Sequence, residues 1–300
     1  MNESQSEKKA LKFVNKYREL LKGICIFLVA FAIGYGGIKV VNIFKAGLQN
    51  NSSSDSTMSD STTNTENTCV GNVVGINLHG TIMTYIPNHA DNDSFFDYDS
   101  TASEDVVWTI KKANEDEKIK AILVEVDSSG GYPVAGEEIS NAIKNSDKPV
   151  VGLIRQMGAS AAYWAISSAD KIFASKNSDV GSIGVTQSYL SNVKKNNKDG
   201  YTFEQLSAEK YKDAGSADKS LTAEERALFI RDINIVYENF MEDISQNRKI
   251  PIEKVKSFAD GSTVLGEKAK ELGLIDEIGG INEVETYLEE TMGEKPEICW

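Results

Sequence analysis

Histidine is nearly absent from this sequence, with only His79 and His89 among 300 residues. Histidine is the usual general base that activates a serine or cysteine nucleophile. Both histidines lie well upstream of Ser160, the serine discussed below. The chain has no other histidine that could complete a Ser-His-Asp triad. We therefore expect any nucleophile in this chain to use a different base, and lysine is the natural candidate.

Cysteine is scarce as well, and its scatter excludes two further classes of protein. The three residues, Cys25, Cys69 and Cys299, are too few and too widely spaced for a disulfide framework or a zinc site. Spacing leaves open whether Cys69 and Cys299 join, which requires that the two ends of the folded body meet. The acidic segment 88–100 lacks the glycine and the closing glutamate of a calcium-binding loop. We therefore expect neither a metal nor a cofactor.

Positive charge is outweighed by negative charge, and the formal net charge is −13. Binding nucleic-acid phosphates requires clustered lysine and arginine side chains. The acidic side chains are instead spread along the chain, and solubility is a sufficient explanation for them. The charge balance therefore argues against a nucleic-acid partner.

The N-terminal part has the composition of a membrane anchor followed by a tether. Residues 1–22 are basic, and residues 23–44 are a largely apolar run that Lys39 interrupts. This order predicts a cytoplasmic N-terminus, a single-pass signal-anchor in the cell membrane and an exported body. A cleaved signal peptide is the alternative, although no clear cleavage site follows the run. Residues 45–69 are rich in Ser, Thr, Asn and Asp, which predicts a flexible linker to a body at 70–300.

The body alternates apolar strands with amphipathic helices. This βαβα order predicts an α/β fold with a mostly parallel sheet, followed by a helical C-terminal part. The continuous apolar run at 121–126 is typical of a buried parallel strand, and Thr222 with Glu225 fits a helix capping box. We expect strands at 73–83, 121–126, 149–154 and 171–174, and helices at 102–116, 133–145, from Ser160 to about 169, from 222, from 251 and at 281–291.

Three glycine-containing turns follow predicted strands, at residues 128–131, 158–161 and 181–185. In a parallel α/β sheet, the turns at the carboxyl ends of strands gather at one edge, where ligands bind. Ser160 stands on the middle turn, directly before a predicted helix whose first N–H belongs to Ala161. Backbone N–H groups at such a position stabilise an oxyanion. The pattern predicts an acyl-transfer site; a small serine that merely packs at a helix start is the alternative.

Four motifs together resemble one known family. They are Met157 to Trp164, Ala169 to Ile172, Gly181 to Val185 and Gly266 to Asp276. Through them, residues 73–290 resemble the membrane-anchored signal peptide peptidases of the SppA type. The resemblance implies a Clp-peptidase or crotonase-like fold of repeated ββα units. It also implies a serine peptidase that works with a Ser-Lys dyad.

The resemblance assigns roles to individual residues. A lysine serves as a base only in its neutral form, which removal from water favours. The chain has many lysines, and its own pattern does not choose among them. The implied residues are the nucleophile Ser160, the base Lys212 (with Lys210 as the main rival), the lysine-orienting Ser182, and the oxyanion N–H groups of Ala161 and Gly131 (with Gly130 as the alternative).

The sequence departs from the family pattern in two places. Ser129 stands where the family often has proline, and Ala161-Ala162 stands where it often has two glycines. Alanine keeps the backbone N–H, so the oxyanion donor survives. Tyr163 and Trp164 follow directly, and for both we expect core packing rather than substrate contact.

The resemblance implies a membrane-anchored serine endopeptidase that hydrolyses peptides such as remnant signal peptides. It further implies a ring-like homo-oligomer of the octamer type, in which Ser160 and Lys212 meet across a subunit boundary. One alternative is a non-catalytic scaffold or regulator that keeps the fold and loses the chemistry. Another is an acyl-CoA enzyme of the crotonase type, which an exported body disfavours because acyl-CoA is poorly accessible there.

Overall fold

The structure is a computed structural model that describes residues 71–86 and 100–300. The predicted basic N-terminus, membrane span, linker and most of the acidic segment lie outside these residues. Within the described part, no helix has both the length and the apolar character needed to span a bilayer.

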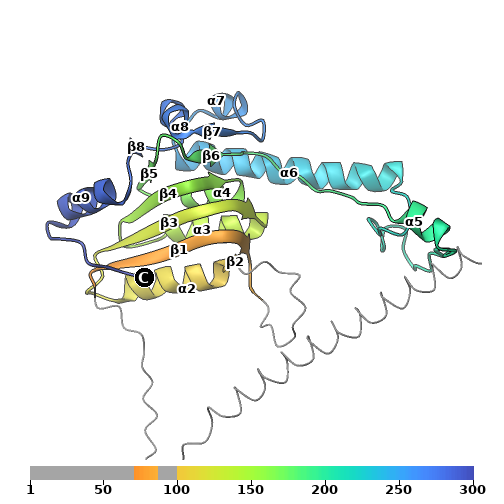
Figure 1. Ribbon diagram of the computed structural model, residues 1–300, viewed down its shortest axis with the longest axis horizontal. Coiled ribbons are helices and arrows are strands. Elements are labelled where there is room, and N and C mark those ends of the chain that lie inside the picture. Colours follow the sequence, from red (N-terminus) through yellow and green to blue (C-terminus); the bar gives the residue numbers. More distant parts are fainter. Residues whose placement is uncertain (1–70, 87–99) are drawn as a thin grey trace, which may run out of the picture. The chain divides into compact units, whose positions relative to one another are not determined.

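The described body is built on a nine-stranded sheet with the order β2-β1-β3-β4-β5-β8, to which β6, β7 and β9 add at the side (Figure 1). All its pairs are parallel except β6 with β7. The mostly parallel α/β prediction is therefore confirmed. The strands are β1 (Val73–Met83), β2 (Ser100–Ala102), β3 (Ala121–Gly131), β4 (Val150–Ala159), β5 (Lys171–Ala174), β6 (Asp179–Gly181), β7 (Thr263–Leu265), β8 (Glu277–Ile278) and β9 (Ile298–Cys299).

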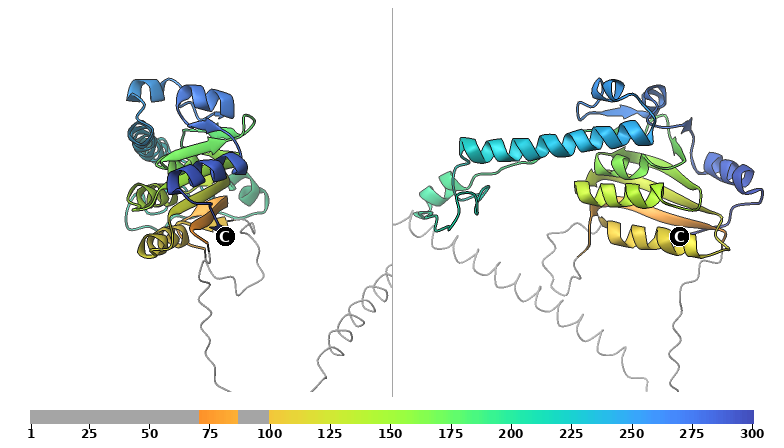
Figure 2. Two further views of the ribbon diagram at one scale, coloured as in Figure 1. Left: turned by 90° about the vertical axis from the view of Figure 1, so that its left-hand side faces the viewer. Right: turned by 180° about the vertical axis from the view of Figure 1, so that it is seen from behind.

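Helices cover both faces of this sheet (Figures 1 and 2). On β3, Ile122 and Val124 belong to a core that also holds side chains of α2, α3 and α4, whereas Ala121 and Leu123 belong to a second core under α9. Burial on both faces explains why this strand is a continuous apolar run. The helices are α2 (Ser103–Glu115), α3 (Pro133–Lys144), α4 (Ala161–Ile166), α5 (Val193–Lys198), α6 (Ala223–Asn247), α7 (Ile252–Lys256), α8 (Gly266–Leu272) and α9 (Ile281–Met292).

Two central strands run further than their apolar residues predict. β3 continues to Gly131 and β4 to Ala159, because Ser128 pairs with Gly158 and Ala159 pairs with Gly181 of β6. The prediction took these polar and glycine-rich ends as turns. The extra pairing brings the ends of three parallel strands to one edge of the sheet. In contrast, α4 is shorter than predicted and ends at Ile166 rather than near 169.

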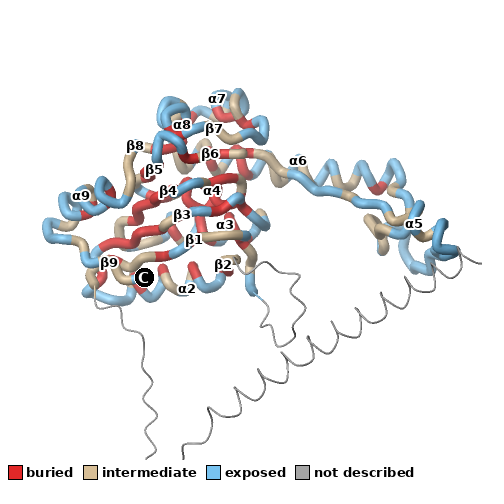
Figure 3. Tube along the Cα trace, viewed as in Figure 1, coloured by how far each residue is buried: buried red, intermediate tan, exposed pale blue. Residues whose placement is uncertain are grey.

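The segment from β6 to α6 extends beyond the edge of the sheet. Every residue from 197 to 212 is exposed (Figure 3), and α6 reaches this segment with its N-terminal end (Figure 1). The predicted capping box is present, since Thr222 accepts from the Glu225 N–H and Glu225 accepts from the Thr222 N–H. We call residues 184–222 together with the start of α6 the arm.

The two ends of the described body meet. Val74 of β1 pairs with Cys299 of β9, and the N–H groups of Asn72 and Val73 both donate to the Glu297 carbonyl at 3.0 and 3.2 Å. Cys299 is disulfide-bonded, and its partner lies outside the described residues. A pairing of Cys69 with Cys299 requires that the two ends of the folded body meet, and the structure fulfils this requirement.

Peptide mapping of unreduced protein is expected to recover Cys299 joined to Cys69. Cys69 is the cysteine nearest in sequence to Gly71, where an added Cβ would lie 1.9 Å from the Glu297 carbonyl oxygen of the C-terminal segment. A Cys25→Ser variant should leave the linked peptide unchanged. Alkylation of Cys69 before reduction, or a link from Cys299 to Cys25, would contradict the pairing.

Candidate active site

Ser160 occupies a strained turn between β4 and α4. Its φ of 53° and ψ of −127° place a non-glycine residue in a region that side chains rarely adopt. The turn is held from both sides, because the Ser160 N–H donates to the Gly181 carbonyl at 2.7 Å and the Ser160 carbonyl accepts from the Trp164 N–H at 2.9 Å. A serine on a sharp strand-to-helix turn is the geometry that presents a nucleophilic hydroxyl.

The glycine turn at the end of β3 packs directly against Ser160. Gly130 has a φ of +110°, and a Cβ added there would lie 2.8 Å from the Ser160 Cβ and 3.0 Å from the Ala161 nitrogen. Only glycine permits this backbone conformation together with so close an approach. The ends of β3 and β4 therefore bring Gly130, Ser160 and Ala161 into contact, as the turn pattern predicted.

The hydrogen bonds distinguish the two oxyanion candidates on this turn. The Gly130 N–H donates to Ser128 Oγ at 3.0 Å, so it is already used. The Tyr132 N–H donates to the Ile82 carbonyl of β1 at 2.8 Å. Gly131 lines the cavity beside Ser160, whereas Gly130 is not among the described residues that line it. The geometry favours Gly131 over the alternative Gly130.

Replacing Gly130 with alanine is expected to cost stability and activity together. The positive φ alone costs about 1–3 kcal/mol for a non-glycine residue, and the new methyl group would collide with Ser160 and displace the Gly131 N–H. Denaturant unfolding and a peptidase assay measure the two effects. Gly293→Ala is the matched control, because Gly293 also has a positive φ of 75° but nothing within 4 Å of an added Cβ. Equal effects of the two substitutions would contradict this account.

Ser182 follows the neighbouring strand and lies beside this turn. Because Ala159 pairs with Gly181, Ser160 and Ser182 come next on adjacent parallel strands. Ser182 also has a positive φ of 50°, and its Oγ donates to the Gly261 carbonyl at 2.9 Å. That bond uses the one hydrogen of the hydroxyl and leaves its lone pairs to accept from an amine. The geometry fits the lysine-orienting role that the resemblance implies.

A cavity of about 530 Å³ opens beside Ser160, Ala161 and Ser182. Side chains of α4 and α6 form an apolar wall: Trp164 stacks on Phe240 with ring centroids 4.6 Å apart, and Tyr237 lies on the same wall. The Trp164 Nε1 donates to Asp243 at 2.8 Å. The prediction for Trp164 was therefore incomplete, because this residue is buried in the core and also lines the cavity.

Tyr163 behaves as a core residue, as predicted. Its ring is fully buried, and its hydroxyl donates to the Leu274 carbonyl at 2.8 Å. Burial raises the pKa of Tyr163 far above its usual value, so the phenol stays protonated. It therefore acts as a fixed hydrogen-bond donor between α4 and the C-terminal part.

Lys212 does not reach the cavity within one chain. Among the described residues that line the cavity there is no lysine. Lys212 is exposed on the arm between α5 and α6, and this segment lies at the end of α6 away from α4 (Figures 1 and 2). The structure therefore brings Ser160, Ala161, Gly131 and Ser182 together and leaves Lys212 apart from them.

Lys210, the rival base, is engaged in contacts that keep it charged. Its Nζ lies 3.9 Å from a Glu224 carboxylate oxygen and 5.1 Å from the centroid of the Tyr211 ring. Hydrogen bonding to Tyr211 is the main cause that raises the pKa of Lys210, and the charge of Glu224 adds to it. A general base must lose its proton, so these contacts disfavour Lys210.

His79 lies on β1, away from this cavity. Its Nε2 lies 3.3 Å from Glu125 on the neighbouring strand, and His79 does not line the cavity beside Ser160. His89 lies outside the described residues. The described residues that line this cavity include no histidine.

Together these features define a class of protein: an α/β protein that presents a serine on a strand-to-helix turn, between backbone N–H groups and beside a cavity with an apolar wall. Comparison with known proteins is consistent with that class. The family model described as peptidase family S49 matches residues 142–295, which include Ser160, Ser182 and Lys212. The chain therefore belongs to peptidase family S49.

Individual relatives agree with this assignment. A protein of Methanocaldococcus jannaschii is 33% identical over 199 residues, covering 63% of this chain and 64% of that protein. The protein named "Serine protease SPPA, chloroplastic" from Arabidopsis thaliana is 30% identical over 183 residues, covering 60% of this chain and 27% of the relative. The chain thus spans less than two thirds of the length of either relative.

Among solved structures, a ClpP1 mutant from Listeria monocytogenes is 17% identical with a TM-score of 0.45, covering 69% of this chain and 91% of that one.

Proposed function

We propose that this protein is a membrane-anchored serine endopeptidase that hydrolyses peptides in an acyl-enzyme mechanism. The observation that carries the proposal is the strained Ser160 turn, with the Gly130-Gly131 backbone packed against it and a cavity with an apolar wall beside it. A structural serine has no need of such strain, which persists only where the surroundings enforce it.

In the proposed reaction, Ser160 Oγ attacks the carbonyl carbon of the scissile peptide bond. Lys212 Nζ accepts the hydroxyl proton and then donates it to the leaving amine. The N–H groups of Gly131 and Ala161 stabilise the oxyanion of the tetrahedral intermediate. A water molecule deprotonated by Lys212 then attacks the acyl-enzyme, which releases the carboxylic acid and restores the Ser160 hydroxyl.

We propose that Lys212 comes from a neighbouring copy of the chain in a ring-like homo-oligomer. In a single chain Lys212 is exposed to water, and the cavity has no lysine among its described lining residues. Packing the arm onto a neighbour would bury Lys212 and favour its neutral form. Ser182, whose Oγ keeps its lone pairs, would then receive the amine.

The substrates proposed are apolar peptides, such as remnants of signal peptides. The cavity wall of Trp164, Tyr237 and Phe240 suits an apolar side chain. The basic residues 1–22 and the apolar run 23–44 support an anchor in the cell membrane with the body exported. A disulfide at Cys299 also fits an exported body, because disulfides persist in oxidising compartments.

Labelling with a fluorophosphonate tests this function directly. The full-length protein in detergent should take up one label, which peptide mass spectrometry should place on Ser160. Heat-denatured protein is the control, since an activated hydroxyl depends on the fold.

The absence of labelling, together with no cleavage of apolar peptides by folded protein, would favour the second candidate. That candidate is a non-catalytic scaffold, and the observation in its favour is the absence of a lysine from the described cavity wall of one chain.

A further inference from the structure

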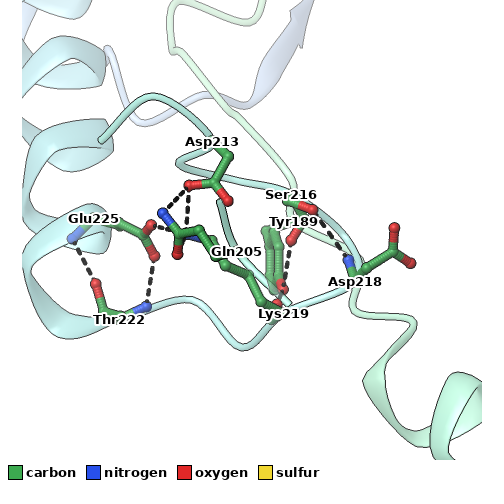
Figure 4. Close-up of polar contacts among 8 residues, drawn as sticks. All are labelled: Tyr189, Gln205, Asp213, Ser216, Asp218, Lys219, Thr222 and Glu225. Carbon is green, nitrogen blue, oxygen red and sulfur yellow. Dashed lines mark hydrogen bonds and ion pairs between the residues drawn. The ribbon is translucent and has the colours of Figure 1, made fainter. Parts of the chain in front are cut away.

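Lys219 lies at the centre of a polar network in the arm (Figure 4). Its Nζ lies 3.0 Å from Asp213 Oδ1 and 2.7 Å from Glu225 Oε1, and it donates to Gln205 Oε1 at 3.2 Å. Only 15% of the Lys219 side chain and 3% of the Glu225 side chain are exposed. A largely buried charged cluster thus sits beside residues 197–212, which are all exposed.

The charges of this network neutralise one another. Burying a lysine is costly unless anionic partners compensate for the lost hydration. Hydrogen bonds to Glu225 and then Asp213 raise the pKa of Lys219, and the bond from Lys219 is the main cause that lowers the pKa of Glu225. Lys219 therefore stays charged around neutral pH and cannot itself be a neutral base. The role of Lys219 is therefore to hold other groups in place rather than to accept a proton.

One side of the network holds the turn that carries Lys212. Asp213 follows Lys212 directly, and its Oδ1 accepts from both Lys219 and Gln205. The backbone of the turn is closed by a bond from the Ala214 N–H to the Tyr211 carbonyl at 3.1 Å. Within the described residues no hydrogen bond or ion pair is found for the Lys212 side chain. The next side chain, Asp213, is instead fixed by both Lys219 and Gln205.

The other side of the network holds the start of α6. Glu225 uses both carboxylate oxygens, since Oε2 accepts from the Thr222 N–H at 2.9 Å and Oε1 binds Lys219. A Cβ added to Gly215 would lie 3.0 Å from the Phe229 ring of α6, so the turn also packs closely on this helix. Lys219 therefore joins the Lys212 turn to the start of α6, the helix whose middle residues Ile233, Tyr237 and Phe240 line the cavity.

We propose that Lys219 is a positioning residue for the general base: its ammonium group, bridging Asp213 and Glu225, fixes the turn at 211–216 on α6 so that Lys212 is presented to the neighbouring subunit. This inference rests on the proposed function, because it needs Lys212 to act as the base. The sequence alone does not single out Lys219 from the other lysines of the chain, since its partners are known only from the folded arm.

The test compares full-length Lys219→Met, Lys219→Arg and wild-type protein in steady-state peptide hydrolysis. Lys219→Met should lower kcat about 100-fold, the cost of a misplaced catalytic group, and should leave KM within about threefold, because the cavity is untouched. Lys219→Arg should restore kcat to within about tenfold of wild type, since a guanidinium bridges the same two carboxylates. The matched control is Lys268→Met, which removes an exposed lysine paired with Glu271 on α8.

The outcomes separate this inference from the proposed function. If the wild type and Lys268→Met cleave no peptide, the proposed function fails and the role of Lys219 fails with it. If both are active and Lys219→Met matches them, only the role of Lys219 is overturned. A rise in KM with unchanged kcat, or no rescue by arginine, also overturns it, since the network would then serve binding or packing. If Lys219→Met does not assemble, Asp213→Asn takes its place, with the same fall in kcat expected and the same outcomes overturning the role.

Discussion

Replacing Ser160 with alanine is expected to abolish peptide hydrolysis, with a loss of about 10⁶-fold in kcat, as for other serine peptidases that lose the nucleophile. The reason is that no acyl-enzyme can form without the Ser160 hydroxyl. The fold should remain, because the Ser160 contacts seen here are made by its backbone N–H and carbonyl. A continuous peptidase assay and thermal unfolding measure the two properties.

The control for this substitution is Ser257→Ala, which removes an exposed hydroxyl beyond α7 that donates to the Lys254 carbonyl. That variant should keep full activity. Peptide cleavage by Ser160→Ala at a rate near that of the wild type would show that another group is the nucleophile. The assignment of the strained turn as the catalytic turn would then be wrong.

Replacing Lys212 with alanine is expected to lower kcat about 10⁴-fold, the upper range for loss of a general base. Without the amine, nothing accepts the Ser160 proton, so labelling of Ser160 by a fluorophosphonate should slow by a similar factor. KM should change little, because Lys212 does not line the apolar wall of the cavity.

Lys210→Ala is the matched control, because Lys210 lies two residues earlier on the same exposed segment. Its pairing with Glu224 and contact with Tyr211 are surface interactions, and such pairs contribute little. Lys210→Ala should therefore retain most of the activity. The reverse ranking, with Lys210→Ala inactive and Lys212→Ala active, would transfer the base role to Lys210.

Much of the fold could be predicted from the apolar pattern. The strands at 73–83 and 171–174 match their predicted bounds, and the capping box of α6 is confirmed. The ends of β3 and β4 were missed because their residues are polar or glycine, and only pairing between strands makes them extended. The strands of two or three residues, such as β8 and β9, carry too few side chains to show a period.

Part of the candidate site could also be predicted from the sequence. Ser160, Ala161 and the glycine pair come after the apolar runs of predicted strands, so their residue types and order predict a shared edge. The choice between Gly130 and Gly131 depends on the Ser128 hydroxyl, a contact two residues away that spacing does not reveal. Phe240 and Tyr237 lie on α6, and only the fold places that helix beside the cavity at Ser160.

Mixing two inactive variants tests the central claim most directly, namely that Ser160 of one subunit works with Lys212 of its neighbour. Ser160→Ala and Lys212→Ala proteins are dissociated, mixed in equal amounts and reassembled, and peptide hydrolysis is compared with each variant alone. We predict recovery of about a quarter of wild-type activity, because random mixing places an intact serine beside an intact lysine at one boundary in four. Mixed oligomers that form and remain as inactive as the separate variants would contradict a site shared between subunits.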